Sequence, residues 1–118
     1  MPEELLDAPL TDKERVFLRC GLHEWEGPAH CTEEFARAMG FGNVEGLIEE
    51  GGRLRERLGR HEPLSWPDWK RALLATEIVF ASDVIGSGCD WQSTTGFSDE
   101  DSIRLLRSIQ RKLMKAMT

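Results

Sequence analysis

The stretch that most constrains the fold runs from Ser65 to Ile85, with the sequence SWPDWKRALLATEIVFASDVI. Ser65 can cap a helix, and Pro67 falls in the first turn, where its missing N–H costs nothing. From Asp68 to Ile85 the chain contains neither glycine nor proline. At about 3.6 residues per turn, apolar side chains cover nearly all sides of this helix, so other helices must surround it. The sequence therefore predicts an all-α fold around a central buried helix at about 66–85.

Four further segments carry helix start and stop signals. Each begins at a residue whose side chain can cap a helix N-terminus: Thr11, Thr32, Asn43 and Ser98. The predicted helices run from 11 to the Gly27-Pro28 stop, from 32 to 39, from 43 to about 58, and from about 99 to 117. We therefore expect a compact bundle of four to five helices.

The apolar periodicity assigns an inner face to each of these helices. In the first helix the inner face is Phe17, Leu18, Gly21, Leu22 and Trp25; in the second it is Phe35 and Met39. In the third it is Val44, Leu47, Ile48, Leu54 and Leu58, with a kink or break expected at Gly51-Gly52. The amphipathic C-terminal helix has an apolar arc, Ile103, Leu106, Ile109, Leu113, Met114 and Met117, opposite a basic stripe, Arg104, Arg107, Arg111 and Lys115.

The chain length allows one domain. With 118 residues, a folded domain has a radius of gyration of about 13–14 Å. We assign residues 11–118 to a single helical domain. Residues 1–10 are predicted to form a loose tail that docks through Leu5, Leu6 and Leu10.

Charge and cysteine content limit the classes of partner and compartment. The net charge is −6, but residues 1–50 hold 12 acidic and 4 basic side chains, whereas residues 51–118 hold 9 acidic and 11 basic. The acidic half argues against nucleic acid or membrane as the main partner and favours a basic protein. The three cysteines are irregularly spaced, and no apolar run approaches the length of a membrane span. We therefore expect a cytoplasmic protein.

A metal site is one candidate. Cys20, His23, His30 and Cys31 give the pattern C-x2-H-x6-H-C, and all four are residue types that bind zinc. Cys20 and His23 would share one helix face, but the adjacent His30 and Cys31 would both have to turn toward it. The plainer alternative is a half-buried thiol beside surface imidazoles, and we predict no metal or other cofactor.

Two carboxylates inside the most apolar helix form a second candidate. Glu77 and Asp83 lie in the predicted central helix, and a buried acid with a raised pKa can act as a general acid. A small-ligand or metal-dependent enzyme could use Glu77, Asp83 or Asp90 in a pocket between this helix and the 86–97 loop. The alternative is a structural acid paired with an arginine.

Residues 32–58 have the rhythm of a helix-turn-helix, the third candidate. Arg53, Arg57 and Arg60 would lie on the outer face of its second helix. The acids Glu45, Glu49 and Glu50 would lie where such a helix meets phosphates, which weakens DNA binding. We therefore keep a helix-turn-helix regulator only as an alternative.

The 86–97 loop is the best functional candidate, because loops of about 12 residues without regular structure are uncommon and often bind ligands. It presents Asp90, Trp91, Gln92, Ser93, Thr94 and Thr95. Tryptophan is a favoured interface anchor, and Trp66 is expected near the surface as well. In the alternative, Trp91 and Phe97 fold back onto the core.

These features favour a non-enzymatic bacterial interaction module that acts as an inhibitor, immunity factor or regulator. The predicted partner-binding residues are Asp90, Trp91, Gln92, Thr94, Thr95 and Trp66. A homodimer through the central helix is a further alternative, because so much apolar surface could exceed what a short chain covers by itself.

Overall fold

The computed structural model describes residues 4–27, 29 and 31–117. The elements in these residues are β1 (Leu5–Leu6), α1 (Asp12–Glu24), α2 (Glu33–Ala38), α3 (Val44–Gly59), β2 (Leu64–Ser65), α4 (Trp66–Ala81), α5 (Trp91–Thr95) and α6 (Asp99–Met117). The predicted small all-α bundle is confirmed. The radius of gyration, 13.3 Å, falls in the expected range.

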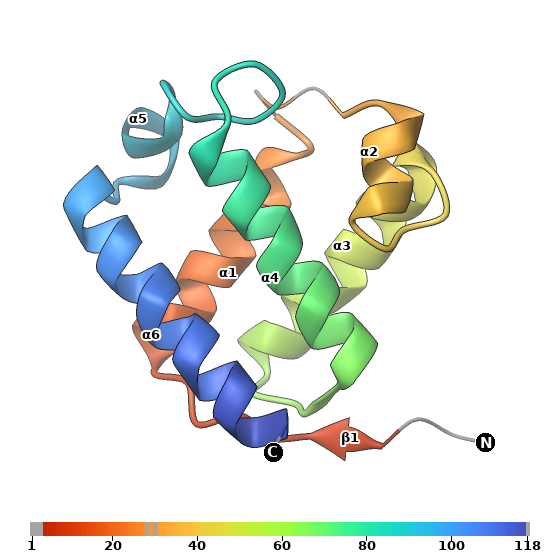
Figure 1. Ribbon diagram of the computed structural model, residues 1–118, viewed down its shortest axis with the longest axis vertical. Helices are drawn as coiled ribbons and strands as arrows, with labels where there is room; N and C mark the ends of the chain where they lie inside the picture. Colours follow the sequence, from red (N-terminus) through yellow and green to blue (C-terminus); the bar gives the residue numbers. More distant parts are fainter. Residues whose placement is uncertain (1–3, 28, 30, 118) are drawn as a thin grey trace.

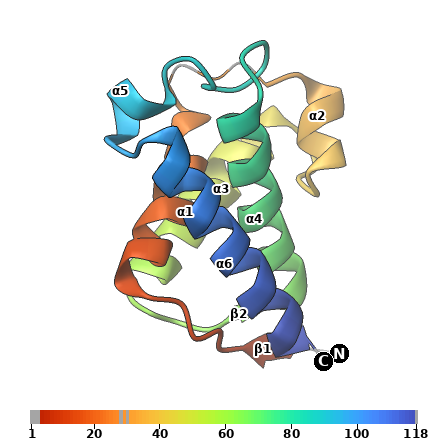
Figure 2. The same ribbon diagram turned by 60° about the vertical axis from the view of Figure 1, so that its left-hand side comes forward.

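Helices α1 and α4 cross at the centre of the molecule, as Figure 1 shows. Helices α3 and α6 both pack against this pair. Figure 2 shows that α2 and α5 lie at one end of the bundle and the β1–β2 ribbon at the other. The bundle therefore has two distinct ends, joined by the long helices.

The predicted caps explain where the helices begin. The Thr11 side chain accepts a hydrogen bond from the Glu14 N–H, and Glu14 accepts one from the Thr11 N–H, which completes a capping box. Asn43 and Ser65 accept from the third residue of α3 and of α4 in the same way. Each cap satisfies an N–H that the helix cannot pair internally, so these boundaries follow from local sequence alone.

The α1–α4 crossing depends on small side chains. A Cβ atom placed on Gly21 would lie 2.2 Å from the Thr76 hydroxyl oxygen. Thr76 is 0% exposed, and its hydroxyl donates to the Ala72 carbonyl at 2.8 Å. The buried face of α4 continues through Ala75 and Val79. Short side chains therefore face α1, and the larger apolar side chains of α4 lie toward its edges.

The central helix is shorter than predicted. Helix α4 ends at Ala81, and the backbone of Ser82 is extended. The chain then turns back over the helix end, where the Ser87 N–H donates to the Val79 carbonyl at 2.7 Å. The loop thus takes an acceptor that a longer helix would use, and the prediction that residues 82–85 are helical is wrong. Val84, an apolar residue of the predicted central helix, is 87% exposed.

Several residues assigned to inner faces lie on the surface. The exposed fractions are 36% for Phe35, 42% for Ile48, 53% for Ile103, 61% for Met114 and 40% for Met117. Ile48, Ile103 and Met114 lie at or near an edge of their apolar arcs, whereas Met117 lies inside the α6 arc, at the end of the helix. The arcs were therefore right in direction and too broad.

Helix α3 continues through Gly51-Gly52 without the expected break. Gly51 is buried, and a Cβ at this position would be 4.0 Å from a Leu22 methyl group. Packing against α1 therefore outweighs the low helix propensity of the glycine pair.

The N-terminal segment is attached more firmly than a loose tail. Leu5 and Leu6 pair antiparallel with Ser65 and Leu64, and the Leu6 carbonyl accepts a hydrogen bond from the Trp69 indole at 2.9 Å. Leu6 and Leu10 pack against the core as predicted, whereas Leu5 is 55% exposed. The two-residue strands carry no sequence signal of their own.

A buried carboxylate joins α1 to α6. Glu14 is 2% exposed and accepts hydrogen bonds from the Lys112 ammonium at 2.6 Å and the Ser108 hydroxyl at 2.5 Å. Burial raises the pKa of Glu14, but the hydrogen bonds from Lys112, Ser108 and Thr11 outweigh it, so that its pKa lies below the ordinary value. Ionised Glu14 therefore stabilises the packing of α6 on α1.

Substitution of Gly21 by alanine tests the helix crossing. The added methyl group meets Thr76, so we expect the free energy of unfolding to fall by about 1–3 kcal/mol in urea denaturation. Gly52→Ala is the matched control: nothing lies within 4 Å of its Cβ position, so its better helix propensity should raise stability by about 0.5–1 kcal/mol. Equal shifts in both variants would contradict a close crossing.

Substitution of Glu14 by glutamine tests the buried carboxylate. At pH 7 we expect the free energy of unfolding to fall by about 1–3 kcal/mol, because the charged hydrogen bond with Lys112 is lost. The folded-state pKa is depressed, so the contribution is present above the unfolded pKa of about 4.3 and is lost as pH falls through the folded pKa. The wild-type advantage should therefore shrink in denaturation curves recorded at successively lower pH below that value.

The control for Glu14→Gln is Glu100→Gln. Glu100 pairs with Arg104, but the two side chains are 75% and 71% exposed. Such pairs contribute about 0–1 kcal/mol, so this variant should change stability little at any pH. An equally small effect of Glu14→Gln would show that α6 does not depend on the buried carboxylate.

Candidate functional site

The 86–97 segment is held to the core by its aromatic side chains. Trp91 is 0% exposed, and its indole donates to the Ser102 hydroxyl at 2.8 Å. Its ring packs edge-on against Phe17 and Phe80, with centroids 5.4 and 5.6 Å apart, and Phe97 also packs edge-on against Phe17. Trp91 is therefore a core residue, and its side chain is not on the surface where a partner anchor is predicted.

The segment is also not a structureless loop, because it contains α5. The Thr94 hydroxyl donates to the buried Glu24 carboxylate of α1, and the Thr95 hydroxyl donates to the Trp91 carbonyl at 2.6 Å. Asp90 and Gln92 are exposed. Thr94 is exposed as well, although its hydroxyl is bonded to Glu24.

Trp66 does not share a surface with them. It is half-buried and begins α4 directly after β2. Figure 2 places β2 and α5 at opposite ends of the bundle. The predicted binding residues therefore do not form one continuous patch.

Of the three candidate acids, Asp83 and Asp90 both raise the pKa of the nearby Cys89 thiol, whereas Glu77 bonds to α6. Glu77 accepts a hydrogen bond from the Gln110 amide of α6 at 2.5 Å. Asp83 and Asp90 are exposed on the segment that follows α4. A hydrogen bond from the Cys89 thiol to Asp83 raises the pKa of Cys89, which keeps that thiol protonated. Neither Asp83 nor Asp90 lines any of the four pockets described in this structure, and Glu77 lines only the one between α4 and α6.

Of the predicted cysteine and histidine ligands, Cys20 and His23 line the same hollow beside α1. His30 lies outside the described residues. His23 contacts Glu26 at 3.1 Å, and burial raises the pKa of the half-buried Cys20, which disfavours the thiolate that a metal requires. Within residues 4–27, 29 and 31–117 no three potential ligands form a metal-sized group.

The helices of the proposed helix-turn-helix form, but Arg53, one of its three predicted outer-face arginines, is engaged within the protein. The Arg53 guanidinium donates to Glu50 at 2.7 Å and to both oxygens of Asp68 at 3.1 Å. Burial lowers the pKa of Arg53, but these hydrogen bonds outweigh it and raise the pKa. The charge of Arg53 is therefore balanced inside the protein.

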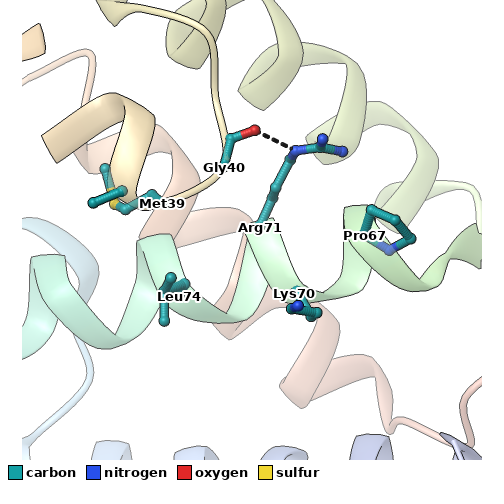
Figure 3. A pocket seen from close by; sticks show the side chains of 7 residues that line it. Met39, Gly40, Pro67, Lys70, Arg71 and Leu74 are labelled. Carbon is teal, nitrogen blue, oxygen red and sulfur yellow. Dashed lines mark hydrogen bonds between the residues drawn. The ribbon is translucent and has the colours of Figure 1, made fainter. Parts of the chain in front are cut away.

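A pocket of about 220 Å³ lies between α2 and α4. Figure 3 shows that Arg71 crosses it to donate to the Gly40 carbonyl, at 2.7 Å. Arg71 also bonds Asp68 at 3.0 Å. Its guanidinium thus joins the turn after α2 to α4 through two of its N–H donors.

A second hollow, of about 350 Å³, separates α4 from α6, and we call it the α4–α6 groove. Its lining is Glu77, Phe80, Ala81, Ile103, Leu106, Arg107 and Gln110. Arg107 donates to the Gln110 amide oxygen at 3.0 Å, and Gln110 in turn donates to Glu77. The groove therefore has apolar walls and a hydrogen-bonded bridge between its two helices.

Sequence patterns alone did not single out this groove. The apolar arc predicted for α6 spans about 140° at 100° per residue, more than the roughly 100° that a core-facing helix needs. This excess width was the available signal. It does not say which edge of the arc is exposed, because that depends on the rotation of α6 against α1.

No protein family model, no curated protein and no solved structure matches this chain. In the described part of the chain, no helix is long and apolar enough to span a membrane. Its function must therefore be argued from the groove and its surroundings.

Substitution of Trp91 distinguishes a core residue from a surface anchor. We expect Trp91→Ala to lower the free energy of unfolding by about 3–5 kcal/mol, because a fully buried ring is removed. Gln92→Ala, at the exposed neighbouring position, should change it by less than about 0.5 kcal/mol. Urea denaturation measures both. An unchanged stability of Trp91→Ala would restore Trp91 as a candidate anchor.

Proposed function

We propose that this protein is a non-enzymatic interaction module whose binding surface is the α4–α6 groove. The single observation that carries the proposal is the exposed apolar surface beside the groove. Ile103 and Met114 are 53% and 61% exposed on the same helix. Exposed apolar patches with polar rims are typical of interaction surfaces.

The composition of the groove supports protein binding over catalysis. Its walls are formed by Phe80, Ala81, Ile103 and Leu106. Its one carboxylate, Glu77, is hydrogen-bonded to Gln110. A shallow apolar groove with few polar groups suits burial of a partner side chain, which contributes roughly 25 cal/mol per Å² of apolar area.

The exposed part of the 82–97 segment continues this surface in our proposal. Val84 follows the end of α4 and is 87% exposed. Asp90 and Gln92 supply polar groups on the same segment. The 86–97 segment thus keeps a proposed role in binding, at the rim of the interface instead of through Trp91.

Capture of a partner tests the proposal. Immobilised wild-type protein is compared with Ile103→Glu in native lysate, followed by mass spectrometry. We expect a partner that the wild type retains and that Ile103→Glu loses, because a charge in a buried interface is costly.

The matched control is Ile48→Glu. Ile48 lies on α3, is 42% exposed and does not line the groove. The Ile48→Glu variant adds the same charge as Ile103→Glu and should leave capture of the partner unchanged. Equal loss in both variants would point to a charge effect, and equal retention would place binding away from the groove.

A further inference from the structure

Four apolar residues lie on one side of α6, and we call them the α6 stripe. Ile103, Met114 and Met117 are exposed, whereas Leu106 is half-buried. Gln110 separates Ile103 and Leu106 from Met114 and Met117. At 100° per residue these positions lie within about 80° of one another, and at 1.5 Å per residue they extend over about 21 Å. That length equals about four turns of a second helix.

A basic flank lies beside the α6 stripe. Arg104, Arg107 and Arg111 are exposed and lie within about 60° of one another on the neighbouring side of the helix. Between residues 102 and 117 the chain contains five basic residues and no acidic one. Arg104 pairs with the exposed Glu100, and Arg107 bonds the neutral amide of Gln110. The flank therefore keeps a positive potential at its surface.

We propose that the α4–α6 groove and the α6 stripe bind an amphipathic α-helix of another protein, whose acidic edge faces Arg104, Arg107 and Arg111. The inference rests on the proposed function and names the chemistry of its partner. An amphipathic helix places apolar side chains every three or four residues along one face, so two of its turns can contact the two apolar pairs of the α6 stripe, Ile103 with Leu106 and Met114 with Met117. Acidic side chains next to them complement the basic flank.

The charge of this surface differs from that of the N-terminal half, from which a basic partner is predicted. The acids of that half do not line the groove. At the groove itself the nearest charges are Arg107 and the hydrogen-bonded Glu77. The local potential decides which partner docks, because charges more than about 10 Å away are largely screened in physiological salt.

A second copy of this chain suits the stripe less well. In an antiparallel pair of α6 helices related by a two-fold axis, the same flank of each helix lies on the same side. The arginines of both flanks would then meet. In a parallel pair the acidic first turns, with Asp99, Glu100 and Asp101, would lie side by side. Both arrangements place like charges together, which costs several kcal/mol.

Two synthetic peptides test the inference. Each has about 18 residues, or five helical turns, with leucines at helical spacing; one carries glutamates beside the leucines and its twin carries lysines. Fluorescence anisotropy with the full chain is measured at low and at physiological salt. We expect saturable binding of the acidic peptide, with an affinity at least about tenfold higher than that for the basic twin. This affinity should fall as the salt concentration rises.

Variants locate the binding. The double variant Arg107→Glu and Arg111→Glu should lower the affinity for the acidic peptide by at least about tenfold and should prefer the basic twin. Ile103→Glu should also lower the affinity for the acidic peptide, whereas Ile48→Glu on α3 should change that affinity by less than about twofold. Circular dichroism confirms that each variant keeps its helices.

Three outcomes would overturn the inference. The first is equal or tighter binding of the basic twin to the wild type. The second is no saturable binding of the acidic peptide. In that case capture of a partner that Ile103→Glu loses still supports the proposed function, so the two failures are distinguishable. The third is a wild-type dimer in sedimentation that Ile103→Glu dissociates, because a second copy would then occupy the surface.

Discussion

The close approach of α1 and α4 at Gly21 and Thr76 is the constraint on which the rest of the structure depends. The Thr76 side chain lies directly against the backbone of α1 at Gly21, so that even a methyl group on Gly21 would overlap it. The buried face of α4 is accordingly made of Ala72, Ala75, Thr76 and Val79, with Trp69 at its beginning. The larger apolar residues of α4, among them Phe80 and Leu74, cannot also face α1. They therefore lie at the edges, where α6 and solvent meet the helix.

The C-terminal third of the chain is fixed to this central pair by polar groups as well as by packing. Glu14, in the first turn of α1, accepts hydrogen bonds from Ser108 and Lys112 of α6. Glu24, the last residue of α1, accepts a hydrogen bond from Thr94 of α5. Buried carboxylates are costly unless they are paired, so both ends of α1 specify how the following segments dock. The 86–97 segment is thus structural on its inner side, and only its outer side is available to a partner.

Local signals in the sequence were sufficient for the helix starts and insufficient for the faces. Thr11 and Ser65 act within three residues of themselves, so their capping could be predicted without knowing the fold. The position of Trp91 depends on Phe17 and Ser102, which belong to other helices. Periodicity gave α6 an apolar arc but not its rotation. For the same reason the predicted binding residues were placed on a segment that is mostly held to the core, and the groove was not foreseen.

The exposure of the α6 stripe follows from the contacts on the other side of that helix. Ser102 receives the Trp91 indole N–H, and Ser108 and Lys112 bond Glu14. At 100° per residue, all three side chains point away from Ile103 and Met114. Rotating α6 to bury the stripe would break these hydrogen bonds and leave the buried Glu14 carboxylate without the Lys112 ammonium, at a cost of about 3–5 kcal/mol. The contacts of α6 with α1 and α5 therefore keep the stripe at the surface of the described part of the chain, where a second molecule can bury it.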